Sequence, residues 1–230
     1  MKVIYRISET GYPKEKPSYI NNKDCFINAY QKLDECEFIV IADNINDDTK
    51  QFLLTFVDNI IEVSVGHGAG TFNIALDTAL KMDHNEVVYF LENDYIHREG
   101  AKKALEDVFN SDILFDYATL YDHPDKYLNP YEGGNPFCVG KGEQTKVFLT
   151  ETSHWKYTNS STMTFVSRVS TLKEDETILR KWTSETYPHD FNMFIELGQK
   201  GRKILSSIPG YSTHGETKWL SPLINWKEQL

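Results

Sequence analysis

The chain has 230 residues, a net charge of −10 and 40% hydrophobic residues. This composition fits one or two folded α/β domains and excludes a disordered chain. A polyanion binds nucleic acid or anionic membranes poorly, and the sequence has no Lys/Arg block, since Lys14-Glu15-Lys16 is short and mixed.

Neither end-of-chain signals nor cysteines indicate export. No apolar stretch approaches the roughly 18 residues that span a bilayer. The N-terminus runs directly into a strand pattern and does not resemble a signal peptide. Cys25, Cys36 and Cys138 are scattered and odd in number, which argues against a disulfide framework or a Cys-rich zinc site. We therefore expect a cytoplasmic protein.

The first half of the chain alternates strand and helix patterns. A strand near residues 3–7 leads into a loop with Gly11, Pro13 and Pro17, and Asn21-Asn22 can cap the next helix. The elements expected after that loop are a helix at 26–33, strand 38–42, a helix capped by Asp47-Asp48, strand 60–65, a helix at 72–80, strand 86–91 and a helix at 101–109. This order predicts an α/β fold with a parallel sheet and helices on both faces.

The second half has weaker periodicity and more Tyr, His, Asn, Gly and Pro. Segments 117–121 and 161–169 read as strands, separated by a long loop at 124–143. The remaining expected elements are a helix with a capping box of Thr171 and Glu174, a helix that begins at Asp190, and a last strand at 203–209.

The most informative segment is the end of the fourth expected strand, which runs into Glu92-Asn93-Asp94. Side chains two apart on a strand point the same way, so Glu92 and Asp94 would project together. Carboxylates at this edge of a sheet suit Mg²⁺ or Mn²⁺ and lie where α/β folds bind ligands. The alternative is two solvated acids at a strand exit.

Other polar groups follow the first two strands. Arg6 and Ser8 end the first, and Asp43 ends the second, so a parallel sheet would place them at one rim. The carboxylate of Asp43 suits a base imide or a ribose hydroxyl, but it also suits a turn or helix cap.

A glycine run precedes the helix at 72–80. Gly66, Gly68 and Gly70 would let backbone amides approach a phosphate, and Asn73 would reach the same ligand. The spacing is not the dinucleotide-binding fingerprint, and a tight turn is the simpler interpretation.

The second half carries further candidates. Asp190 stands at a helix start, where it is either a general base or an N-cap. His214 follows the last strand in a Gly-flanked loop, as a metal ligand or a polar loop residue. His154, beside Trp155, is a structural or substrate-facing candidate.

In this order of motifs the chain resembles the GT-A glycosyltransferases of the large family-2-like inverting group, and in particular small glycosyltransferase domains encoded by chloroviruses. Leu91-Glu92-Asn93-Asp94-Tyr95 stands where that family has its Asp-x-Asp variants. His189-Asp190 matches its catalytic acid at a helix start, and His214 its later histidine. The Asn in the middle of the acidic motif departs from the pattern and leaves Asp94 as the firmest metal ligand.

The resemblance implies a GT-A, Rossmann-like sheet with a smaller mixed acceptor-side region. It implies a single domain over 1–230, with residues 1–97 binding a nucleotide sugar and residues 98–230 binding the acceptor. Under it, a viral chain would act in the host cytoplasm. The implied partners are a nucleotide diphosphate sugar, with UDP the commonest nucleotide, and a carbohydrate acceptor.

The resemblance also implies residue roles. Asp94 and His214 would hold Mn²⁺ or Mg²⁺ on the diphosphate, and Asp190 would take the proton of the attacking hydroxyl, with inversion. Arg6, Ser8, Asp43, Gly68, Asn73, Glu92 and Asn93 would line the donor site, and His154, Trp155, Tyr127 and Tyr131 would line the acceptor site.

Two other functions fit parts of the sequence. A nucleotidyltransferase also uses an α/β fold, carboxylates and a divalent ion, but would want a basic residue at the α-phosphate, for which Arg6 and Lys141 are the convenient candidates. A non-enzymatic carbohydrate-binding module would use the aromatic, Asn and acidic residues. Such modules are usually all-β, which the helical alternation argues against.

Overall fold

The computed structural model describes residues 1–10 and 13–230. Gly11, in the first predicted loop, lies outside the described residues. The chain forms two compact units whose segments alternate along the sequence. The first unit comprises Met1–Pro13, Glu35–Asn93 and Ser160–Arg202, and the second comprises Lys14–Asp34, Asp94–Asn159 and Lys203–Leu230.

The first unit is built on strands in the order β3-β2-β1-β4-β9. Pairing is parallel from β3 to β4, and β9 joins β4 in antiparallel orientation. The central residues of β1, β2 and β4 are mostly apolar and buried, as expected for strands covered on both faces, whereas those of the edge strand β3 are exposed. The bounds are Lys2–Ser8 for β1, Glu37–Asp43 for β2, Ile60–Val63 for β3, Val87–Glu92 for β4 and Phe165–Arg168 for β9.

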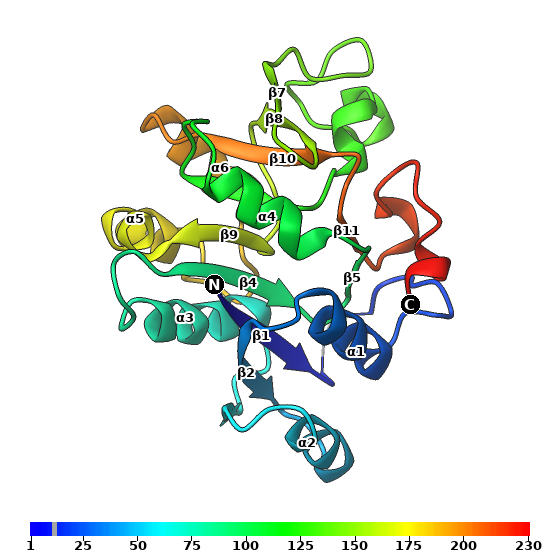
Figure 1. The fold of residues 1–230 in the computed structure, drawn as a ribbon, viewed down its shortest axis with the longest axis vertical. Helices are drawn as coiled ribbons and strands as arrows, with labels where there is room; N and C mark the ends of the chain where they lie inside the picture. Colours follow the sequence, from blue (N-terminus) through cyan, green and yellow to red (C-terminus); the bar gives the residue numbers. More distant parts are fainter. Residues whose placement is uncertain (11–12) are drawn as a thin grey trace. The chain divides into compact units, whose positions relative to one another are not determined.

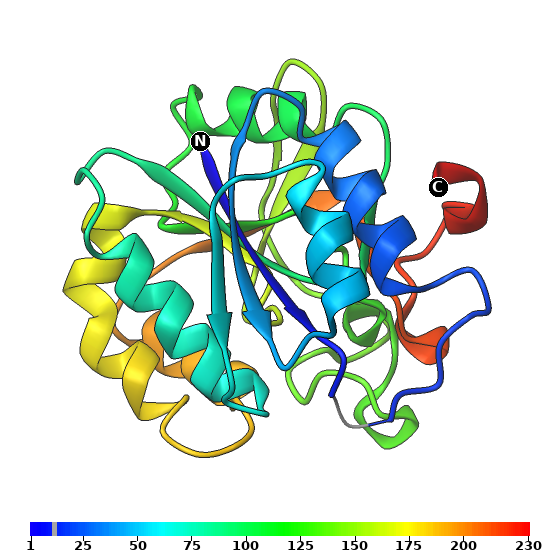
Figure 2. The ribbon, with the colours of Figure 1, turned by 90° about the horizontal axis from the view of Figure 1, so that it is seen from below.

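Helices of the first unit bury one face against these strands. In α3 the residues Phe72, Ala75, Leu76 and Ala79 are fully buried, and α3 packs against β1 and β2. Figure 2 shows α3 beside α5, which in turn packs against α6. The helices are α2 (Asp47–Leu54), α3 (Gly68–Ala79), α5 (Val169–Lys181) and α6 (Asp190–Gln199).

The second unit has its own strands in the order β6-β10-β8-β7, with a separate antiparallel pair, β5 and β11 (Figure 1). Helix α1 packs against β5. The bounds are β5 Tyr95–His97, β6 Tyr117–Thr119, β7 Val147–Leu149, β8 His154–Thr158, β10 Ile204–Ile208, β11 Ser212–His214, α1 Asn22–Lys32 and α4 Ala101–Phe109. Short 3₁₀ turns lie at η1 Pro124–Tyr127, η2 Pro130–Glu132, η3 Thr217–Trp219 and η4 Trp226–Gln229.

The expected α/β fold class is confirmed, and each helix and strand that the sequence predicts in the first half is present close to its predicted position. Two caps differ. Asn46, not Asp47, caps α2, because its side chain accepts from the amide of Thr49 over 2.8 Å. Thr171 lies inside α5, which begins at Val169, so the predicted capping box is wrong.

The strands β5, β7, β8 and β11 are absent from the sequence-based expectation. Two of them, β5 and β11, position the site described below. In the described part of the chain no helix is both long and apolar enough to cross a membrane.

Candidate functional site

The pair β5–β11 brings the end of the acidic motif to His214. Asp94 directly precedes β5, and Tyr95 of β5 pairs with His214 of β11. The amide of Gly215 then donates to the carbonyl oxygen of Asp94 over 2.6 Å. These backbone bonds fix two side chains that are 120 residues apart in sequence, since both stand at the same end of the short ladder.

The carboxylate of Asp94 is buried among cationic and polar groups of the second unit. Its Oδ2 lies 3.0 Å from Nζ of Lys14, 3.2 Å from Nζ of Lys16 and 3.3 Å from Nε2 of His214. The same Lys14 ammonium lies 3.0 Å from His214 Nε2. Nε2 of His214 accepts from Lys14 when the ring proton is on Nδ1, and it donates to Asp94 when Nε2 carries a proton.

These neighbours keep Asp94 ionised. Burial by itself would raise the pKa of the carboxyl, but His214, Lys14 and Lys16 together hold the pKa well below its usual value. The charged carboxylate is therefore available at neutral pH to a cation.

We tested whether these residues suit the divalent ion that the resemblance implies. The second oxygen of Asp94, Oδ1, is buried and has no hydrogen-bond partner among the described residues. The other ring nitrogen of His214, Nδ1, lies 3.9 Å from a carboxylate oxygen of Glu216, which is too long for a hydrogen bond. The imidazole packs against the ring of Tyr95, with the ring centroids 5.3 Å apart. An unsatisfied carboxylate oxygen beside an imidazole held in this way suits Mn²⁺ or Mg²⁺.

The protein supplies only part of a coordination shell. Among the described residues, no group of three or more His, Cys, Asp or Glu side chains is arranged to hold a metal. Mg²⁺-type sites often have one or two protein ligands and take the remainder from water and substrate phosphates. The pair therefore fits an ion that binds together with a phosphate ligand.

At the ends of the first-unit strands, Asp43 anchors a turn. Its carboxylate is buried and accepts from the amides of Val65 over 2.6 Å and Gly66 over 2.9 Å. Gly66 has a φ of +80°, which only glycine adopts readily. Glycine at this position therefore allows the turn whose amides donate to Asp43. These contacts are those of a turn cap, the second of the two roles that the sequence allows for Asp43.

Arg6 is buried and also binds the glycine turn. Its guanidinium donates to the carbonyl oxygens of Gly68 over 3.1 Å and Met163 over 3.3 Å, and pairs with Glu92 over 3.3 Å. Glu92 also accepts from the hydroxyl of Thr164 over 3.3 Å. The two side chains thus hold the strand end together.

The remaining donor-site candidates make local contacts within the first unit. Asn93 donates to the carbonyl oxygen of Ser8 over 3.3 Å, linking the ends of β4 and β1. Asn73 donates to the carbonyl oxygen of Thr183 over 2.8 Å. Gly68 is the first residue of α3, so the glycine run ends in a helix N-terminus as predicted.

Asp190 is the first residue of α6, and His189 precedes it as the cap residue. The carboxylate accepts from the amide of Phe191 over 2.7 Å, and the side chain is half-buried. His189 lies 3.4 Å from the exposed carboxylate of Glu185. Asp190 belongs to the first unit, whereas Asp94 and His214 belong to the second.

The acceptor-side candidates differ in exposure. Trp155 is fully buried and has no free face for a sugar ring, because β8 places it between β7 and β10. Tyr131 is 85% exposed, and His154 is also exposed. We therefore leave Trp155 out of the acceptor proposal below.

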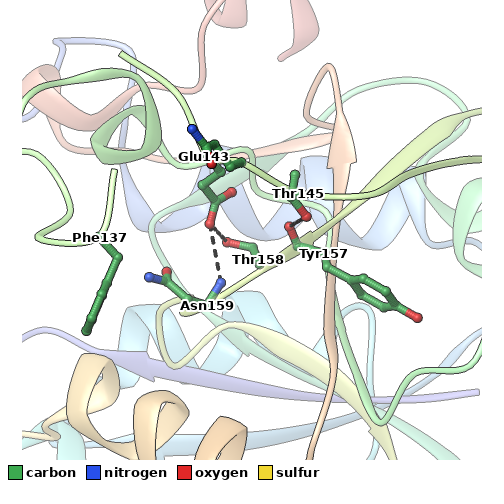
Figure 3. Close-up of a pocket in the computed structure, with 7 residues that line it drawn as sticks. Phe137, Glu143, Thr145, Tyr157, Thr158 and Asn159 are labelled. Carbon is green, nitrogen blue, oxygen red and sulfur yellow. Dashed lines mark hydrogen bonds between the residues drawn. The ribbon is translucent and has the colours of Figure 1, made fainter. Parts of the chain in front are cut away.

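The second unit also contains a pocket, and its lining residues are not those that the sequence analysis selected as acceptor candidates. The pocket has a volume of about 270 Å³ and is drawn in Figure 3. Glu143 accepts from the hydroxyl of Thr158 over 2.8 Å and from the amide of Asn159 over 3.3 Å. Its lining combines a carboxylate, hydroxyls, amides and aromatic rings: Phe137, Glu143, Gln144, Thr145, Tyr157, Thr158 and Asn159.

Behind this pocket lies a buried ionic cluster. Lys156 pairs with Asp122 and Glu143, each over 3.2 Å, and donates to the hydroxyl of Tyr127 over 3.1 Å. Burial lowers the pKa of Lys156, but its anionic neighbours Asp122 and Glu143 outweigh burial and raise the pKa above its usual value, so the lysine stays charged. The sequence analysis expects Tyr127 in the acceptor site, and in the structure its hydroxyl accepts a hydrogen bond from Lys156 of this cluster.

No family model matches the chain. No curated protein is similar to it in sequence. Solved structures are similar in fold at low identity. S. aureus TarS residues 1–349 superpose with a TM-score of 0.54 and 18% identity, over 92% of this chain and 60% of that one. GalNAc-T7 with UDP, GalNAc and Mn²⁺ has a TM-score of 0.58 and 10% identity, over 95% of this chain and 44% of that one.

A T. maritima inositol-1-phosphate CTP transferase is similar over nearly its whole length. The TM-score is 0.51 at 12% identity, over 99% of this chain and 94% of that one. The likeness therefore extends to enzymes that use a nucleotide without being glycosyltransferases. Together with the sheet topology, these similarities show that the chain has the GT-A fold.

Proposed function

We propose that the chain is a glycosyltransferase that moves a sugar from a nucleotide diphosphate sugar, most simply a UDP-sugar, to a hydroxyl of a glycan acceptor. The observation that carries the proposal is the pair of Asp94 and His214. An ionised buried carboxylate and an oriented imidazole stand at the end of the acidic motif of a GT-A fold. Such a pair suits the ion that accompanies a diphosphate.

In this proposal Asp94 and His214 hold Mn²⁺ or Mg²⁺. When bound, the ion supplies Lewis-acid stabilisation of the diphosphate leaving group, worth several kcal/mol. The chain contributes the position of the carboxylate through β5, and it contributes the orientation of the imidazole through β11 and the ring of Tyr95, 5.3 Å away.

The donor proposal divides into direct and indirect roles. Ser8, Glu92, Asn93 and the amides at Gly68 are proposed to contact the donor at the ends of the strands. Arg6, Asp43 and Asn73 bind backbone groups of the glycine turn and of Thr183, so we propose that they shape the donor site. Both terminal nitrogens of the Arg6 guanidinium already donate to carbonyl oxygens, so they are less available to a phosphate.

We propose Asp190 as the general base. A sugar hydroxyl has a pKa far above 7, and a carboxylate aimed at it contributes roughly 10²–10⁴-fold to the rate. Direct attack of that hydroxyl opposite the leaving group would invert the anomeric configuration. Asp190 is half-buried, and its carboxylate accepts a hydrogen bond from the adjacent amide of Phe191.

The pocket of Figure 3 is the proposed acceptor site, together with His154 and Tyr131. Hydroxyl, amide and carboxylate groups can exchange hydrogen bonds with a polyol, and an aromatic ring covers the apolar face of a sugar. Phe137 is 63% exposed and supplies that ring at the pocket.

A nucleotidyltransferase is the second candidate. Its specific support is the near full-length similarity to the inositol-1-phosphate CTP transferase, and Lys14 and Lys16 supply the basic groups that such an enzyme needs. The carbohydrate-binding module has less support, because the all-β architecture usual for such modules is absent from the described residues.

A panel of nucleotide sugars, screened for a rise in melting temperature with and without Mn²⁺, tests the proposal. Mass action raises the melting temperature only for a ligand that binds the folded state. A UDP-sugar that stabilises the protein in the presence of Mn²⁺, and then releases UDP on turnover, supports the glycosyltransferase. Release of pyrophosphate from a nucleoside triphosphate supports the second candidate, and no response to any nucleotide contradicts both.

A further inference from the structure

The cation position between Asp94 and His214 holds an ammonium group of the chain itself. Nζ of Lys14 lies 3.0 Å from Asp94 Oδ2 and 3.0 Å from His214 Nε2. These two side chains are the proposed ligands of the metal ion, so Lys14 occupies the space between them. A divalent ion within reach of both would stand within a few ångströms of the ammonium, where like charges repel strongly.

A cation at this position is needed in the free protein. The side chain of Asp94 is only 5% exposed, and a buried carboxylate without a partner is strongly destabilising. Lys14 and Lys16 both pair with Asp94, so the cluster of two ammonium groups and one carboxylate carries an excess positive charge. The chain as a whole has a net charge of −10, so this local excess is not a general property of its surface.

The segment that carries the two lysines is attached next to the site. The amide of Thr217, three residues after His214, donates to the carbonyl oxygen of Glu15 over 2.8 Å. Glu15 stands between the lysines, so this bond holds both near Asp94. The lysines belong to no helix or strand, and their side chains are 16% and 32% exposed.

We propose that Lys14 is a resident cation of the Asp94–His214 pair that competes with divalent ions. In the free protein its ammonium satisfies both side chains, so divalent ions bind weakly. A diphosphate gives the displaced ammonium a new anionic partner, so ion and diphosphate bind better together than apart. The inference rests on the proposed function for the diphosphate, but the competition itself involves only residues of this chain.

The test is a titration of the whole chain with Mn²⁺ in the absence of nucleotide. Electron paramagnetic resonance measures the concentration of free Mn²⁺ at each step. Lys14→Met removes the charge but keeps much of the side-chain length. We expect it to bind Mn²⁺ about tenfold more tightly than the wild type, or better. Lys16→Met should tighten binding less, since Lys16 is the more distant and more exposed partner of Asp94.

The matched control is Lys227→Met, which removes the same charge from an exposed lysine of η4 and should leave Mn²⁺ affinity unchanged. The double variant Lys14→Met/Asp94→Asn should lose the gain in Mn²⁺ affinity. That loss would show that the ion binds at Asp94. Should circular dichroism show Lys14→Met to be unfolded, Lys14→Gln carries the same expectation, because its amide still donates to Asp94. Mn²⁺ affinity equal to or weaker than wild type in the folded neutral variant overturns the proposal.

A second titration in the presence of UDP separates this inference from the proposed function. UDP should tighten Mn²⁺ binding in the wild type and do so less in Lys14→Met. If Lys14→Met binds Mn²⁺ more tightly than the wild type and UDP changes the Mn²⁺ affinity of neither protein, the competition is supported and the nucleotide diphosphate site is contradicted. A UDP effect in both, with no gain from Lys14→Met, contradicts the competition and leaves the nucleotide site standing.

Discussion

Gly215 and Asp94 are in backbone contact: the amide of one donates to the carbonyl oxygen of the other over 2.6 Å. A Cβ atom on Gly215 would lie 2.6 Å from that oxygen and 2.7 Å from Cγ2 of Ile20, which is closer than real Cβ atoms come. Glycine at this position therefore lets the end of β11 approach Asp94. The approach brings His214 to the carboxylate.

Gly215→Ala should separate the two strands and destabilise the fold, by about 1–3 kcal/mol if the cost matches that of other overpacked sites. Mn²⁺ binding should weaken in the same variant because His214 moves with the backbone. Urea unfolding and Mn²⁺ titration measure the two effects. The control is Gly198→Ala in α6, where an added Cβ meets open space and no loss of stability is expected. Equal stability of the two variants would contradict the close-approach argument.

His97 predicts a pH dependence of stability. Its side chain is fully buried, and burial lowers the pKa from 6.5 to about 3. Below pH 6.5 the unfolded chain takes up a proton that the folded protein does not bind until about pH 3, so stability is full above 6.5 and falls as the pH drops. The loss is about 1.4 kcal/mol per pH unit, or about 2 kcal/mol between pH 6.5 and pH 5.

Urea unfolding at pH 7.5 and pH 5 should show that loss in the wild type and a smaller one in His97→Gln, which has no group to titrate. His84→Gln changes an exposed histidine and should keep the wild-type loss. Identical pH dependence in His97→Gln and the wild type would mean that His97 is not the group responsible.

Much of the first unit follows from the sequence, because its strands are long apolar runs and its helices have clear apolar faces. The short strands β5 and β11 could not be predicted in the same way. Each strand has three residues, which is too few to show the alternation of apolar and polar residues that identifies a strand in a sequence. Their pairing, which brings Asp94 to His214, depends on contacts between distant segments.

The roles of charged residues were harder still to predict. Lys14 and Lys16 flank an acid, and the sequence analysis treats them only as a short segment of mixed charge, yet both reach the carboxylate of Asp94. Arg6 and Asp43 stand at strand ends, where ligand contacts were expected, yet they bind backbone atoms of the glycine turn. Side-chain identity in a sequence does not reveal a backbone partner sixty residues away.

Asp190→Asn should keep donor binding and lose transfer. The amide retains an oxygen to accept from the amide of Phe191, so the start of α6 should survive, but it cannot take a proton. The expected fall in turnover is roughly 10²–10⁴-fold. Titration with UDP and Mn²⁺ measures donor binding, and product formation measures transfer. Glu185→Gln neutralises an exposed neighbouring carboxylate and should leave both unchanged. Turnover near the wild-type value in Asp190→Asn would assign the base to another residue.

Phe137→Ala should weaken acceptor binding without affecting the donor. The ring is 63% exposed and lines the pocket that holds Glu143 and Asn159, so its removal takes away an aromatic face but little core packing. A contact of this type is worth about 0.5–1.5 kcal/mol, which corresponds to a threefold to tenfold rise in acceptor KM. Val139→Ala, at a 77% exposed residue that does not line the pocket, is the control. A rise in donor KM with acceptor KM unchanged would place the acceptor away from this pocket, since Phe137 would then act on the other substrate.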